Sequence, residues 1–132
     1  MTPADAFPAV SAVLIEQLRE IVGDAGLLTG GEVASRYPGY FMDRIGADAI
    51  VRPRTTDEVA AILRLCSAAG QPVVVHGGMS GWVRATETRR GEIALSLERM
   101  AAIETIDPVN RTATVQAGVV LETLETELAG HG

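Results

Sequence analysis

The spacing of apolar side chains predicts helices in the first half of the chain and near its end. Over residues 9–22 the apolar positions recur at helical intervals, and Gly23 follows as a stop signal. A second helix opens at Thr55, which stands three residues before Glu58 as in a capping box. A third helix begins near Val119. The apolar stripe of the second helix comprises Val59, Ile62, Leu63 and Cys66.

Shorter runs of β-branched and other apolar residues predict strands. These runs are residues 49–52, closed by a proline, then 72–75 and 92–97. Residues 103–107 and 111–117 predict a β-hairpin, because turn-forming residues separate them. A strand, a helix and a strand within roughly 30 residues are typical of a right-handed βαβ crossover with parallel strands. The pattern therefore predicts an α+β (mixed α/β) fold, with a βαβ unit, a β-hairpin and flanking helices.

A turn-rich segment, residues 26–48, separates the first helix from the first predicted strand. It holds Tyr37, Tyr40 and Phe41, and we expect a long surface segment whose aromatic side chains anchor it to the body. We accordingly divide the chain into two parts. Residues 1–48 form an N-terminal helix and an aromatic-containing loop, and residues 49–132 form the α/β unit.

Composition narrows the classes of function. The chain has 132 residues, 47% hydrophobic and 21% charged, which is typical of a globular domain. Its net charge of −6 argues against general nucleic-acid binding, which needs a positive surface. No apolar run reaches a membrane span, and no secretory signal is evident, so we expect a cytoplasmic protein. One cysteine and two histidines predict neither an internal disulfide nor a metal site.

The candidate chemistry lies in the sequence PVVVHGGMSGW, residues 72–82, where an apolar run gives way to glycines. A buried strand followed by a glycine-rich loop brings bare backbone amides up to an anion, and glycines also supply positive φ. An ordinary tight turn is the alternative. A nicotinamide-binding fold is disfavoured because the G-x-G-x-x-G spacing is absent, and a Walker A loop is excluded because the chain has no lysine.

Three segments together resemble one family. These are VRPRTTDEVAAILRLCSAAGQPVVVHGGMSG, GEIALSLERM and IETIDPVNRTATVQAGV, within residues 49–132. They resemble the first lobe of the two-lobed FAD-binding domain of the FAD-linked oxidases, of the vanillyl-alcohol oxidase and p-cresol methylhydroxylase type. The branch is that of D-lactate dehydrogenase, D-2-hydroxyglutarate dehydrogenase and the glycolate oxidase D subunit.

The resemblance implies that the loop wraps the pyrophosphate of FAD with its amides. The implied cofactor-binding residues are His76, Gly77, Gly78, Met79, Ser80, Gly81 and Trp82. Some members attach flavin through a histidine where Met79 stands here, so we expect FAD to bind non-covalently. Relatives also have a small residue at Met79, and often two glycines where Arg84 and Ala85 stand. Arg84 could reach a phosphate or crowd the site.

Several alternatives stay open at this point. His76 could contact flavin or simply pack in the body, and Trp82 could shield the flavin or fill the core. The family's second lobe, substrate domain and catalytic residues would follow Gly132, so we assign no catalytic residue. One hypothesis is the FAD-binding lobe of a 2-hydroxyacid dehydrogenase or oxidase, not competent alone. The other is a truncated, non-catalytic α/β module that acts through self-association or partner binding.

Overall fold

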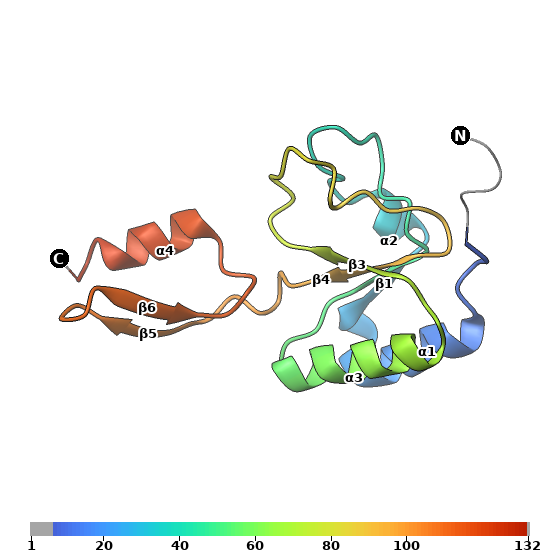
Figure 1. The fold of residues 1–132 in the computed structure, drawn as a ribbon, viewed down its shortest axis with the longest axis horizontal. Helices are drawn as coiled ribbons and strands as arrows, with labels where there is room; N and C mark the ends of the chain where they lie inside the picture. Colours follow the sequence, from blue (N-terminus) through green and yellow to red (C-terminus); the bar gives the residue numbers. More distant parts are fainter. Residues whose placement is uncertain (1–6, 132) are drawn as a thin grey trace.

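A four-stranded mixed sheet organises the first hundred residues of the computed structural model, which describes residues 7–131 (Figure 1). The strand order is β1-β2-β4-β3, with β1 antiparallel to β2 and the other neighbours parallel. The elements of this body are α1 (Ala12–Val22), β1 (Leu27–Thr29), α2 (Gly31–Ala34), β2 (Ala49–Val51), α3 (Thr56–Ala68), β3 (Val73–His76) and β4 (Ile93–Ser96).

Helix caps predicted from the sequence set where α3 begins. The Thr55 hydroxyl accepts a hydrogen bond from the Glu58 amide at 3.1 Å, as in a capping box. The returning bond differs from the expected one, because the Glu58 carboxylate accepts from the Arg54 amide at 2.7 Å. Ser11 caps α1 in the same manner through the Leu14 amide.

The sheet is covered on both faces, and alternation along each strand decides which side chain faces which layer. On one face α1 and α3 pack over a core that comprises Leu14, Leu18, Val22, Leu27, Ala49, Val51, Ile62, Cys66, Ile93 and Leu95. On the other face α2 and the chain before β2 cover Leu28, Val33, Ile45, Ala47, Ile50 and Ala94. The predicted stripe of α3 is confirmed at Ile62 and Cys66 but not at Leu63, which is 46% exposed.

Two expectations about residues 26–48 are wrong. This stretch is not simply a surface segment, because β1 pairs with β2 in register Leu27 to Val51 and contributes to both cores. Its three residues were too short to show a period in the sequence. The aromatics at 37, 40 and 41 do not anchor the segment in the body either, because all three side chains are at least half exposed.

The predicted hairpin forms a second unit with α4 (Leu121–Leu128), set to one side of the body (Figure 1). Its strands are β5 (Ile103–Asp107) and β6 (Thr112–Val115), which among residues 7–131 pair with each other alone. No residue from 101 to 131 is buried. The mixed α/β class, with a βαβ unit, a hairpin and flanking helices, is confirmed.

Candidate functional site

The glycine loop, residues 77–83, leaves the carboxyl end of β3. Because β2, β3 and β4 are parallel, their carboxyl ends lie along one edge of the sheet. Open α/β sheets bind ligands at that edge. The sequence therefore predicted the position of the loop correctly, at a strand end on the carboxyl edge of the sheet.

The backbone amides of this loop have no hydrogen-bond partner among the residues that the structure describes. Among residues 7–131, none of the N–H groups of residues 77–83 donates a hydrogen bond to another group. Backbone donors in a folded domain are almost always paired with protein or solvent. A run of free, exposed donors is the feature that an anion-binding loop requires.

The glycines of the loop are not required by the fold. A Cβ added at Gly77 or Gly81 would meet no atom within 4 Å, and at Gly78 only the Ser80 hydroxyl at 3.9 Å. None of the three has a left-handed φ, so the expectation that they supply positive φ is wrong. Packing and conformation would both accept alanine here, which leaves close approach from outside as the remaining use of glycine.

Positive φ falls instead on two residues with side chains. Met79 and Arg84 both have φ 57°, a region that costs an L residue free energy. These are two of the positions at which the resemblance stated from the sequence led us to expect a small residue or glycine. The Arg84 guanidinium makes two hydrogen bonds of 3.0 Å to the Glu87 carboxylate, so in this conformation it is engaged within the chain.

His76 closes the base of the loop. Its ring is 3% exposed, and Nε2 lies 3.0 Å from the carbonyl oxygen of Thr86. Burial lowers the pKa of His76, and the bond to Thr86 opposes this only in part. Nearby, the Thr88 hydroxyl accepts hydrogen bonds from the Gly46 and Ala47 amides, which ties the returning chain to the entry of β2. His76 is thus packed and hydrogen-bonded, and its contact with a cofactor stays a prediction.

Trp82 does not fill the core, since it is 75% exposed. Its ring lies beside the aromatic side chains of residues 37–41, with centroid distances of 6.1 Å to Tyr40 and 5.9 Å to Phe41. Of the seven predicted cofactor-binding residues, His76 is thus buried, Met79 is partly buried, and the other five are exposed around the loop.

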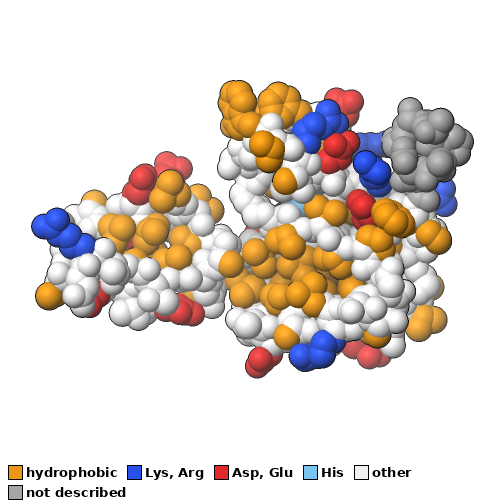
Figure 2. Space-filling view, in the orientation of Figure 1, with side chains coloured by type: hydrophobic (Ala, Val, Ile, Leu, Met, Phe, Trp, Pro, Cys, Tyr) orange, Lys and Arg blue, Asp and Glu red, His pale blue; other side chains and the backbone are white. Residues whose placement is uncertain are grey.

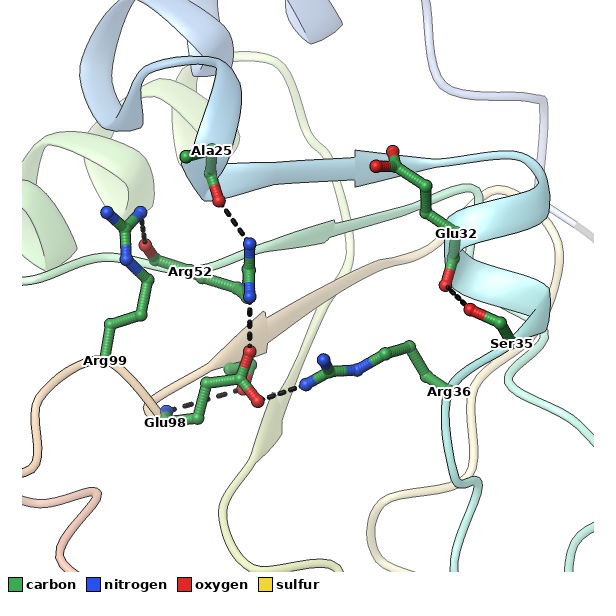
Figure 3. A network of polar contacts seen from close by, with 8 residues as sticks. Ala25, Glu32, Ser35, Arg36, Arg52, Glu98 and Arg99 are labelled. Carbon is green, nitrogen blue, oxygen red and sulfur yellow. Dashed lines mark hydrogen bonds and ion pairs between the residues drawn. The ribbon is translucent and has the colours of Figure 1, made fainter.

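A polar network at the same sheet edge was missed by sequence reasoning (Figure 3). Glu98, just after β4, pairs with Arg36 and, at 2.9 Å, with Arg52 after β2. Arg52 also donates to the Ala25 carbonyl, and Arg99 donates to the Arg52 carbonyl at 3.1 Å. Burial would raise the pKa of Glu98, but its arginine partners outweigh this and lower it. Only the tertiary fold brings these four segments of the chain together, so the network could not be predicted from a sequence motif.

Two classes of site receive no support in the part of the chain that the structure describes. No group of three or more His, Cys, Asp or Glu side chains is arranged to hold a metal ion. No helix there has the length and hydropathy to cross a bilayer.

Comparison with known proteins assigns most of this chain to a family. A family model described as an FAD binding domain matches residues 47–132. An uncharacterized FAD-linked oxidoreductase of Mycobacterium tuberculosis is 35% identical over 120 residues, which cover 86% of this chain and 25% of that protein. The glycolate oxidase subunit GlcD of Bacillus subtilis is 40% identical over 73 residues, 55% of this chain and 16% of that one.

Solved structures share the fold. p-Cresol methylhydroxylase superposes with a TM-score of 0.77 at 22% identity, over 90% of this chain and 24% of that one. Alkyldihydroxyacetonephosphate synthase gives a TM-score of 0.82 at 19% identity, over all of this chain and 28% of that one. The chain therefore spans about a quarter of the length of such relatives.

Proposed function

Since this chain belongs to the FAD binding domain family, we propose that its glycine loop holds the pyrophosphate of a non-covalently bound FAD. The observation that carries the proposal is the run of amides at residues 77–83 that pair with nothing in residues 7–131, in a loop whose three glycines the fold itself does not need. Hydrogen bonds from neutral donors to a charged acceptor contribute about 1.5–3 kcal/mol each. Two or three such bonds would suffice to hold a pyrophosphate.

The residues around the loop fit this role. Gly77 and Gly81 leave the amides open, and Ser80, which is exposed, offers a hydroxyl donor. His76 and Thr86 hold the two ends of the loop together, which reduces the entropy lost when a ligand orders it. FAD, when bound, supplies a hydride acceptor, and this chain supplies its placement.

The test is a titration of the 132-residue chain with FAD, followed by flavin fluorescence. In a variant with both Gly77→Ala and Gly81→Ala, we expect at least a tenfold loss of FAD affinity with no loss of thermal stability. The added methyl groups meet no protein atom within 4 Å. If the phosphates lie on the loop as proposed, these methyl groups would keep them from the amides. Gly31→Ala, in α2, is the matched control, because a Cβ there also meets nothing within 4 Å.

Two outcomes would reject the proposal. One is an absence of FAD binding by the unaltered chain. The other is FAD binding that the double alanine variant leaves unchanged.

We further propose that the whole protein to which such a lobe belongs is a flavin-dependent oxidoreductase acting on small 2-hydroxyacids. Support comes from the names of relatives, among them the glycolate oxidase subunit of B. subtilis and a D-2-hydroxyglutarate dehydrogenase of Xanthomonas citri. We do not expect the 132 residues alone to catalyse. D-lactate, glycolate and D-2-hydroxyglutarate should therefore fail to bleach the flavin of the FAD-loaded chain, and bleaching would contradict this expectation.

For location, the cytoplasm is our proposal, although related proteins of rice and fission yeast are named as mitochondrial. Fractionation of the source cells with an antibody to the chain tests it. Recovery with an organelle would reject it.

A second candidate function, partner binding, is favoured by the hairpin unit. Two strands rarely hold a stable sheet alone, and neither outer edge of β5 or β6 is paired within residues 7–131. Leu121 of α4 is 67% exposed. Such a unit needs a covering surface, which a following lobe or a second copy could provide. Sedimentation velocity of the chain tests self-association, and a monomer at all concentrations would exclude the second copy.

A further inference from the structure

Four of the five aromatic residues of the chain gather in one exposed cluster: Tyr37, Tyr40, Phe41 and Trp82. Their exposed fractions run from 50% for Phe41 to 75% for Trp82. No aromatic residue belongs to either buried core of residues 7–131. Figure 2 shows apolar side chains standing above the body, over the two loops that Figure 1 draws in teal and olive. Aromatic side chains usually lie in cores and interfaces, so an exposed aromatic cluster is a candidate binding surface.

The cluster is built against the glycine loop. Gly39 is buried with φ 105°, and a Cβ placed on it would lie 3.6 Å from the Met79 carbonyl oxygen and 2.7 Å from Met42 Cε. The aromatic segment therefore depends on a glycine for the backbone conformation at residue 39, where it lies beside the loop. Trp82 joins the two, since it follows Gly81 directly and contacts Tyr40 and Phe41.

The rings do not cover one another. Trp82 meets Tyr40 at an interplanar angle of 43° and Phe41 at 78°. Neither arrangement is a parallel stack, and Trp82 keeps three quarters of its surface accessible. An open π face next to unpaired amides suits a molecule that carries phosphates and a flat heteroaromatic ring.

We propose that Tyr40, Phe41 and Trp82 form a stacking platform for one planar ring of the dinucleotide whose phosphates lie on the glycine loop. The proposal rests on the function proposed above and adds the residues that bind the ring. A second copy of the chain fits less well, because the charged pair Arg84–Glu87 and the free amides border the platform. Adenine and isoalloxazine are both flat rings that could stack here, and the choice of ligands in the experiment distinguishes between them.

The experiment uses the 132-residue chain and four ligands: FAD, ADP, FMN and inorganic pyrophosphate, with affinities from calorimetry. Trp82 is the only tryptophan, so we expect its fluorescence to be quenched when FAD binds. Trp82→Leu should lower the affinity for FAD by about five- to 150-fold, the range for loss of one stacked base. The same substitution should weaken the binding of either ADP or FMN to a similar extent, but not of both. A loss for ADP would identify the ring as adenine, and a loss for FMN would identify it as isoalloxazine. The affinity for pyrophosphate should be unchanged. Tyr40→Leu should act in the same direction.

The control is Phe7→Leu, an aromatic that is 44% exposed and outside the cluster, which should leave all four affinities unchanged. Unchanged FAD affinity in both Trp82→Leu and Tyr40→Leu would overturn the platform while leaving the loop's function intact. An equal loss for pyrophosphate would also overturn it, because the substitution would then act on the loop. A dimer that Trp82→Leu dissociates without altering FAD binding would assign the cluster to self-association instead. Failure of the unaltered chain to bind FAD and pyrophosphate would reject both proposals together.

Discussion

Met79 offers a direct test of the loop conformation. Its φ of 57° lies in the left-handed region, which costs a residue with a Cβ about 1–2 kcal/mol and costs glycine nothing. Replacement by glycine also loosens the unfolded chain, which costs about 0.4–1 kcal/mol relative to alanine. We therefore compare Met79→Gly with Met79→Ala, since both remove the same partly buried side chain. The glycine variant should be the more stable of the two by about 0.5–1 kcal/mol.

Urea unfolding followed by far-ultraviolet circular dichroism measures this difference. With a urea slope of about 1–3 kcal/mol per molar, the glycine variant should unfold at a midpoint about 0.5 M higher than the alanine variant. Ser80 is the neighbouring control, because it has no positive φ. There the order should reverse, with Ser80→Ala more stable than Ser80→Gly. A Met79→Ala variant as stable as Met79→Gly would refute the left-handed loop conformation.

Three further predictions concern packing and burial in the described residues. Gly118→Ala should lower the free energy of unfolding by more than about 2 kcal/mol, because the added Cβ would lie 1.8 Å from the Leu97 carbonyl oxygen. An unchanged urea midpoint would contradict this. Burial lowers the pKa of His76 below its unfolded value of about 6.5, so the folded state binds fewer protons than the unfolded state. The free energy of unfolding should therefore fall as pH drops through about 6.5. His76→Gln should flatten this dependence on pH, as measured by urea titrations. Cys66 is 1% exposed and burial raises its pKa, so Ellman's reagent should modify it in urea and not in the folded chain, where rapid labelling would disprove the packing.

The βαβ core was predictable because its signals are local. The capping pair Thr55 and Glu58, the stripe through Ile62 and Cys66, and the valines of β3 each report their own structure within a few residues. The position of the glycine loop followed, because a loop after a parallel strand has to lie at the carboxyl edge of the sheet. Strand β1 was not predicted, because three residues are too few to show a periodic pattern and its position depends on pairing with β2.

The sequence by itself determined the βαβ unit, the β-hairpin, the three longer helices and a glycine-rich loop at the end of β3. Only the tertiary structure decided which backbone positions are left-handed, since φ at Met79 and Arg84 depends on how the loop returns to Thr86. It also decided that the aromatics of two distant segments meet in solvent beside the loop, and that arginines from separate elements converge on Glu98. Such contacts join residues more than forty positions apart, and no local pattern of side chains encodes them.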